Sequence, residues 1–146
     1  MYSIEKVRKS LQGPMSPRRE AIRARKEVLV VVDSAIVFRY TRAAPGRESQ
    51  AFDLFTEAMA FFGTSAHEGK CEEPLTFMGT SGQSLIIVPG EFDALTDLTM
   101  SEEFRELYTK VVFAVPDVAY EFGPYGQGVQ DYMARWARIG NELALI

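Results

Sequence analysis

The chain has 146 residues, 47% hydrophobic and 25% charged, with a formal net charge of −4 at pH 7, values typical of one globular domain. Its longest unbroken apolar runs, such as Val28 to Val32, are far too short to span a membrane. The charged N-terminus is not followed by the apolar core of a signal peptide. The lone Cys71 excludes an internal disulfide and is compatible with a reducing cytoplasm. We therefore expect a cytoplasmic protein that does not enter a membrane.

The charge is unevenly distributed along the chain. Residues 1–26 hold eight basic and two acidic groups, whereas the remainder holds eight basic and eighteen acidic groups. A basic arm of this kind attracts nucleic acid or acidic surfaces. Its only aromatic residue is Tyr2, however, and the acidic remainder repels phosphate. We interpret residues 1–34 as a basic N-terminal arm or helix that lies on an acidic surface of this chain or of a partner, and we do not expect nucleic-acid binding.

The first regular elements are predicted after this arm. Residues 35–42 alternate as a strand does, with Ile36, Phe38 and Tyr40 on one face. Residues 48–62 repeat large apolar side chains every three or four positions, which predicts a helix that ends at Gly63.

Three strands and two helices are predicted in the rest of the chain. Strands at 75–78 and 84–88 flank a glycine- and serine-containing turn, which predicts a hairpin. Thr99 and Glu102 have capping-box spacing, so a helix is expected to start there and to end near Pro116. A strand at 118–122 follows, and residues 129–143 have the pattern of an amphipathic helix.

The order of residues 35–122 is therefore β-α-β-β-α-β, a ferredoxin-like α+β arrangement. Right-handed crossovers predict one antiparallel sheet of strand order 4-1-3-2, with both helices on one face. The opposite face is expected to be too apolar to lie in water, and a second copy in a symmetric homodimer is the expected cover. The helix at 129–143 is the alternative cover. The set predicted for this face is Val37, Arg39, Thr41, Thr76, Met78, Ile86, Val88, Ala119 and Glu121, or else the alternate set.

These segments resemble the dimeric α+β barrel superfamily, and in particular its stress-responsive, antibiotic-biosynthesis-monooxygenase-like and NIPSNAP-like branches. The resemblance rests on residues 37–43, on Pro45-Gly46 before a phenylalanine-rich helix, and on residues 90–95 and 101–104. It implies a dimer with a cavity between sheet and helices in each subunit. The superfamily includes cofactor-independent oxygenases, other small enzymes, haem-binding relatives and proteins without known activity, so the fold does not assign a reaction. It leaves residues 1–34 and 124–146 outside the domain at 35–123.

Two groups of residues are candidates for a site. Arg39 and Glu121 fall on neighbouring predicted strands, beside Thr41 and Thr76, where they would hold an anionic group and supply a carboxylate base, or form an ordinary cross-strand ion pair. An aromatic pocket is the second candidate, with the lining residues Tyr40, Tyr120, Phe122 and Trp136. Core packing explains these aromatic residues equally well.

His67 is the only histidine, and the sequence places it in a polar loop after the first helix. It is a candidate proton-transfer group if it faces a pocket, and an ordinary solvated loop residue otherwise. The acidic residues and Cys71 near it do not have zinc-ligand spacing, so we expect neither a metal nor another cofactor.

Three functions remain open from the sequence. The first is binding of a small apolar or aromatic ligand without assignable catalysis. The second is a cofactor-independent monooxygenase or related enzyme acting on an aromatic or polyketide-like compound, with Arg39 orienting the substrate and Glu121 or His67 moving a proton. The third is an interaction module that uses the N-terminal arm or the C-terminal helix.

Overall fold

A computed structural model describes residue 17 and residues 30–144. The predicted basic arm therefore lies almost entirely outside the described residues. The helices and strands follow in the order β1 (Ser34–Tyr40), α3 (Glu48–His67), β2 (Leu75–Met78), β3 (Ser84–Gly90), α4 (Phe92–Met100), α5 (Glu102–Ala114), β4 (Ala119–Pro124) and α6 (Gln127–Glu142).

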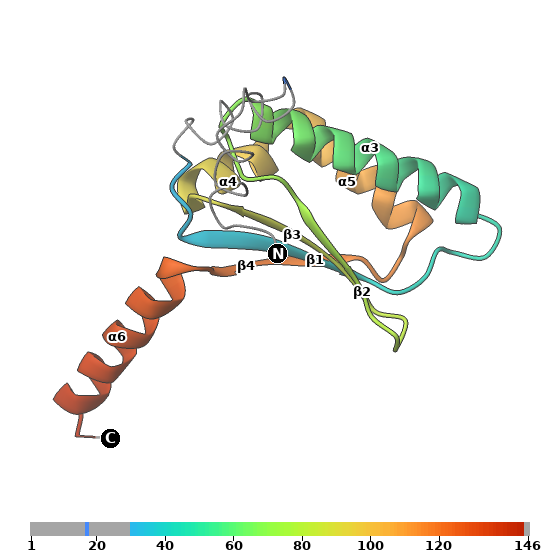
Figure 1. Cartoon of the computed structure of the whole chain (residues 1–146). Coiled ribbons are helices and arrows are strands. Elements are labelled where there is room, and N and C mark those ends of the chain that lie inside the picture. The colour runs from blue at the N-terminus through green and yellow to red at the C-terminus, as the bar shows by residue number, and fades with distance from the viewer. Residues whose placement is uncertain (1–16, 18–29, 145–146) are drawn as a thin grey trace, which may run out of the picture.

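The four strands form one antiparallel sheet of order β2-β3-β1-β4, which is the predicted order read from the opposite edge. Helices α3, α4 and α5 all lie on one face of this sheet, and no helix lies against the other face in the described part of the chain (Figure 1). The predicted α+β class, strand order and one-sided helical layer are therefore confirmed. We call the uncovered side the open face.

The core lies between the sheet and these helices. Ile36 and Phe38 of β1 are buried on the helix-facing side, together with Val88 of β3, because alternate residues of a strand point to the same side. Phe62 of α3 and Phe104 of α5 complete this cluster from above. The apolar faces that the alternating and helical patterns predicted thus pack against each other in one layer.

The predicted composition of the open face mixes the two sides of the sheet and needs correction. Thr76 pairs with Ile86, and Ile86 pairs with Phe38, so these residues and Val88 lie on the helix-facing side. The sequence shows the alternation within each strand but not the register between strands, which decides the side. The observed register gives the open face the side chains of Val37, Arg39, Leu75, Phe77, Leu85, Ile87, Ala119 and Glu121.

Helix α3 is longer than predicted, since it passes through Gly63 and ends at His67. A glycine inside a helix costs about 1 kcal/mol relative to alanine. Burial of Phe62 and Ser65 against the core carries the helix past Gly63, and the Ser65 hydroxyl donates a hydrogen bond of 2.9 Å to the Phe61 carbonyl oxygen.

The second predicted helix corresponds to α5, which is capped by Ser101 rather than Thr99. A further helix, α4, precedes it and was not predicted. The Ser101 hydroxyl accepts a hydrogen bond from the Phe104 amide at 3.2 Å, whereas the Thr99 hydroxyl donates to the Thr96 carbonyl oxygen within α4. A cap two residues later explains the shift, because serine serves the same role as threonine at this position.

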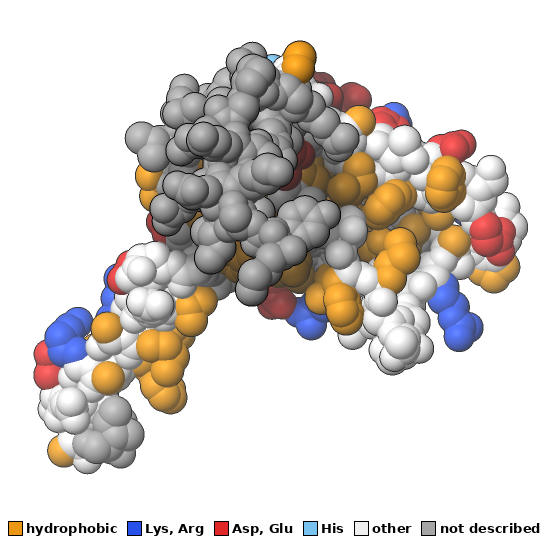
Figure 2. All heavy atoms as spheres, viewed as in Figure 1, with side chains coloured by type: hydrophobic (Ala, Val, Ile, Leu, Met, Phe, Trp, Pro, Cys, Tyr) orange, Lys and Arg blue, Asp and Glu red, His pale blue; other side chains and the backbone are white. Residues whose placement is uncertain are grey.

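Helix α6 follows β4 directly and extends away from the sheet, so it does not cover the open face (Figure 1). None of its residues is buried. Its apolar side chains gather along one flank, on the side of the helix that faces the space beneath the sheet (Figure 2). The helix predicted at 129–143 is thus present, but the alternative that it covers its own sheet is wrong. Within residues 30–144, we find no helix with the length and hydropathy needed to cross a bilayer.

Candidate ligand-binding pocket

A pocket of about 330 Å³ lies between the helix-facing side of the sheet and helices α3 and α5. Strand β1 supplies Phe38 and Tyr40, α3 supplies Phe55 and Phe62, and α5 contributes Val111 among others. The remaining lining residues are Thr41, Ala43, Ala51, Phe52, Leu54, Ala58, Met78, Ile86, Phe104, Leu107, Tyr108, Val115 and Val118. The lining is almost entirely apolar, which is typical of sites for small hydrophobic molecules.

The volume of the pocket depends on small side chains that stand among large ones in its lining. Ala51 and Ala58 lie two turns apart on α3, and both line the pocket beside larger side chains such as Phe55. Close packing normally leaves few voids larger than a water molecule. A methyl group at these two positions therefore keeps open a volume that a leucine or phenylalanine would fill. The resemblance implied a cavity between the sheet and the helices, but the residue pattern did not mark its lining on α3; the alanines on the inner face of this helix were the available signal.

Three side chains bring polar atoms to this lining. The amide of Thr41 donates a hydrogen bond of 2.9 Å to an Asp117 carboxylate oxygen, and the Thr41 hydroxyl contacts the same oxygen. Burial raises the pKa of Tyr40, an effect that a hydrogen bond with Ser84 partly opposes. Burial also raises the pKa of Tyr108, with a smaller contribution from Tyr120. Both phenols therefore remain protonated at neutral pH. The Tyr108 hydroxyl donates a long hydrogen bond of 3.5 Å to the Val118 carbonyl oxygen, which it would exchange for a bond to a ligand oxygen.

Aromatic rings pack tightly beside the pocket. The ring of Tyr120 lies 5.4 Å from that of Phe38 and 4.9 Å from that of Tyr108, measured between centroids. Phe104 contacts the same three rings, at centroid distances of 5.8 to 6.1 Å. Tyr120 is thus part of this packed wall rather than of the lining, so it shapes the pocket by supporting Phe38 and Tyr108.

Arg39 and Glu121 do meet, but on the other side of the sheet. Their side chains form an ion pair on the open face, where both are about half exposed. The pair is diagonal across β1 and β4, because Arg39 pairs in register with Ala119 and Glu121 with Val37. Neither residue lines the pocket. The ordinary cross-strand ion pair considered from the sequence is therefore present, and a role in ligand binding or proton transfer stays a prediction.

The other predicted site residues are dispersed. His67 is the exposed last residue of α3, not a loop residue, and it does not line the pocket. Thr76 is exposed on the edge strand β2, on the helix-facing side and away from Arg39. Trp136 is 63% exposed on α6 and does not line the pocket. Phe122 does not line the pocket either, so of the nine candidate site residues only Tyr40 and Thr41 line it, and their function remains a prediction.

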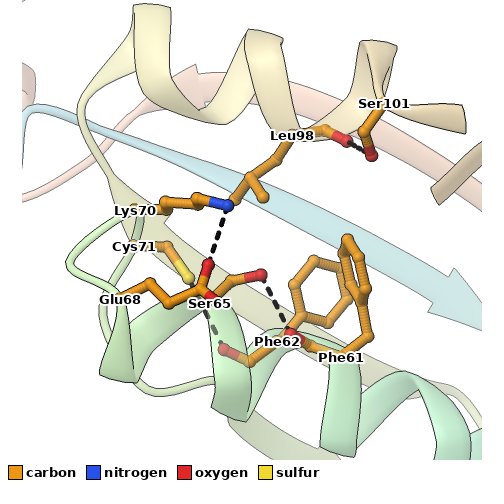
Figure 3. Close-up of polar contacts among 8 residues, drawn as sticks. All are labelled: Phe61, Phe62, Ser65, Glu68, Lys70, Cys71, Leu98 and Ser101. Atoms are coloured by element: carbon orange, nitrogen blue, oxygen red, sulfur yellow. Dashed lines mark hydrogen bonds and ion pairs between the residues drawn. The ribbon is translucent and has the colours of Figure 1, made fainter. Parts of the chain in front are cut away.

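A second hollow, of about 540 Å³, lies among α3, α4 and α5 on the outer side of the helical layer. In it Lys70 contacts Glu68 at 2.7 Å (Figure 3). The neighbouring Ser65 hydroxyl donates to the Phe61 carbonyl oxygen, and the Ser101 hydroxyl donates to the Leu98 carbonyl oxygen of α4. Cys71 is buried beneath, with its sulfur 3.7 Å from the Phe62 carbonyl oxygen. Burial raises the pKa of this thiol to about 12, so it is not a nucleophile at neutral pH.

This hollow is a weaker candidate than the apolar pocket. Its hydroxyl groups are already satisfied by backbone atoms, and its charges are solvated. In the part of the chain that the structure describes, no three histidine, cysteine or acidic side chains are grouped as metal ligands are. We therefore regard the apolar pocket as the candidate site.

Comparison with solved structures identifies the fold. The cofactor-independent oxygenase SnoaB from Streptomyces nogalater, in a mutant form, is similar with a TM-score of 0.50 and 16% identity, over 66% of this chain and 93% of that one. Rv0793 from Mycobacterium tuberculosis gives a TM-score of 0.52 and 16% identity, over 64% and 95% of the two chains. A candidate antibiotic biosynthesis monooxygenase from Deinococcus radiodurans gives a TM-score of 0.53 and 13% identity, over 64% of this chain and 92% of that one.

No family model matches the sequence, and no curated protein matches it at a significant level. The fold is that of the ferredoxin-like α+β proteins that include antibiotic-biosynthesis-monooxygenase-like structures, so the resemblance stated from the sequence is confirmed at the level of the fold. At these identities the similarity does not extend to a reaction.

Proposed function

We propose that this protein binds a small, largely apolar or aromatic molecule in the pocket between the sheet and helices α3 and α5. The observation that carries the proposal is an apolar space of about 330 Å³ with only a few polar atoms at its lining. Apolar walls supply affinity through the hydrophobic effect, and a few fixed donors orient the ligand. Tyr40 and Tyr108 would donate hydrogen bonds to a carbonyl or hydroxyl oxygen of the ligand.

Binding without catalysis is the function that this lining supports best. Proton abstraction needs a base whose pKa lies near the operating pH and which reaches the ligand. Both tyrosines at the pocket have a raised pKa, and His67, Glu121 and Arg39 lie outside it. Among the described residues, the pocket therefore presents hydrogen-bond donors to a ligand rather than a strong base.

The proposal is tested with two substitutions of the same kind on α5. Val111 lines the pocket, whereas its neighbour Val112 does not and is 40% exposed. A neutral naphthylamine fluorophore that brightens in apolar surroundings serves as the probe. We expect Val111→Phe to weaken its binding at least tenfold and Val112→Phe to leave it within twofold.

Overpacking at Val111 costs up to a few kcal/mol and could unfold the domain. Ala58→Leu therefore serves as a second blocking substitution, with Ala60→Leu, on the outer side of the same helix, as its control. Circular dichroism establishes that each variant is folded. Equal probe affinity in folded blocked and control variants would contradict the proposal.

We also propose that two copies pair through their open faces. The support is an exposed apolar surface on a sheet whose other side is already covered: Leu75 is 50% and Phe77 57% exposed. Patches of this kind usually mark an interaction surface. Light scattering at micromolar concentration is expected to give the mass of two chains, and the mass of one chain for Phe77→Asp.

We further propose that the chain divides into a domain at 35–123 and a C-terminal helix at 124–146. A cytoplasmic location is part of the same proposal.

A second candidate function is a cofactor-independent monooxygenase acting on an aromatic or polyketide-like compound. It is favoured by one observation, the similarity in fold to SnoaB, which is itself a cofactor-independent oxygenase. A substrate acidic enough to ionise on its own would not require a base from the chain. Oxygen consumption with hydroxylated polycyclic aromatic compounds tests this candidate. Turnover by the wild type that Val111→Phe abolishes and Val112→Phe retains would favour it over simple binding.

A further inference from the structure

We infer that α6 acts as a clasp in a dimer, which means that its apolar flank packs against the open face of a second copy of this chain. The arrangement is reciprocal, so the helix of each copy covers the sheet of the other. The inference rests on the homodimer proposed above and goes beyond it by assigning a place to the helix outside the domain. The apolar flank consists of Val129, Tyr132, Met133, Trp136, Ile139 and Leu143.

The helix lacks a partner within the described residues. All six side chains of the flank are at least 40% exposed, and the opposite flank carries the charged groups, among them the ion pair of Arg138 with Glu142 at 2.7 Å. A 16-residue helix is marginal in water without tertiary support, and α6 contains Gly128 and Gly140. The sequence thus builds a strongly amphipathic helix whose stability requires an apolar surface elsewhere.

The base of α6 is fixed against the domain, so the direction of the helix is part of the fold. The Tyr125 amide donates a hydrogen bond of 3.0 Å to the Asp33 carbonyl oxygen. Gly128 lies so close to this carbonyl that a Cβ atom there would overlap it. The flank consequently faces the space beneath the open face in a defined orientation (Figure 2).

Area and continuity favour a second copy as the occupant. Four strands spaced about 4.8 Å apart and about six residues long present roughly 380 Å² in projection. A specific interface buries about 800 Å² on each partner. The flank of α6, about 24 Å long and 10 Å wide, adds roughly 240 Å² and continues the same apolar surface around a corner. A two-fold axis lets both helices find an open face at once, since each copy offers one of each.

Trp136 is the only tryptophan of the chain, so its fluorescence reports on the flank alone. At micromolar concentration we expect blue-shifted emission and weak quenching by acrylamide. Dilution to monomers is expected to shift the emission to the red. The Phe77→Asp substitution should also shift the emission to the red. Strand β2, which carries Phe77, and strand β4, which leads into α6, lie at opposite edges of the sheet, so this substitution can affect Trp136 only through a second copy.

Met133→Glu and Ala134→Glu form a matched pair on α6, since Met133 lies on the apolar flank and Ala134 on the polar side. We expect Met133→Glu to weaken the dimer at least tenfold and Ala134→Glu to change it less than twofold. A dimer whose Trp136 is fully accessible to acrylamide would overturn the clasp while the dimer proposal stands. A shielded Trp136 in a monomer would overturn both and place the cover within the same chain.

Discussion

Arg39 and Glu121 form an ion pair that joins the two strands β1 and β4 on the open face, on the opposite side of the sheet from the pocket. The spacing in the sequence was sufficient to predict that the two side chains share a face. It was not sufficient to say which face, and that difference separates a substrate-binding pair from a surface ion pair.

Removing this ion pair is expected to have little effect on the pocket. Exposed ion pairs contribute about 0 to 1 kcal/mol. We therefore expect Arg39→Ala and Glu121→Ala to lower the free energy of unfolding by less than about 1 kcal/mol in urea titrations, with unchanged affinity for a neutral probe. A fall in the affinity for an anionic aromatic ligand, with the neutral probe unaffected, would show that Arg39 does reach the ligand.

The buried thiol of Cys71 predicts a loss of stability at alkaline pH. Its pKa is raised from 9.0 to about 12, first by burial and then by Glu73 and Glu72. The folded state therefore keeps a proton that the unfolded state loses near pH 9, so this contribution is complete below pH 9 and is lost as the pH rises towards 12. The slope is at most about 1.4 kcal/mol per pH unit.

Urea titrations between pH 8 and pH 11 measure this effect. We expect Cys71→Ala to be less stable than the wild type at pH 8 but to show a shallower decline above pH 9. Tyr40 and Tyr108, whose pKa values are raised as well, contribute equally to both proteins. Parallel declines in the two proteins would contradict the assignment to Cys71.

Two glycines inside helices are expected to respond in opposite directions to alanine. At Gly63 a Cβ atom meets nothing within 4 Å, so Gly63→Ala should raise the free energy of unfolding by roughly 0.5 to 1 kcal/mol through helix propensity. At Gly128 the Cβ would overlap the Asp33 carbonyl, so Gly128→Ala should displace α6.

Thermal melts and light scattering compare these two variants. Gly63→Ala is expected to melt higher with an unchanged dimer, and Gly128→Ala to melt lower with a weaker dimer. A Gly128→Ala protein with the wild-type dimer affinity would mean that the orientation of α6 does not matter to assembly.

Periodicity in the sequence was sufficient for most of the fold. The alternation around Phe38 and the helical spacing around Phe55 predicted β1 and α3, and the chirality of crossovers predicted the strand order. Helix α4 was missed because it is short and follows a strand without a separate turn. The cap moved from Thr99 to Ser101 because two capping residues stand close together, and their tertiary surroundings decide between them.

The pocket was harder to predict, for a physical reason. A residue such as Phe62 has the same pattern whether it faces another side chain or an empty space. Whether a cavity remains depends on the combined volumes of side chains from distant segments. The sequence does not show which of these side chains face each other in the folded protein. Tyr40 was found as a lining residue because it continues the inner face of β1, and Thr41 was found for a site on the other face.

Mapping the bound probe by NMR tests the central claim most directly. The neutral naphthylamine is titrated into ¹⁵N-labelled protein, and the amide shifts are followed residue by residue. We expect the largest, saturable shifts around the pocket, in residues 38–43 of β1 and its following loop, 51–62 of α3 and 107–115 of α5. Shifts confined to Leu75 and Phe77 on the open face or to the flank of α6, with the pocket amides unmoved, would contradict the account.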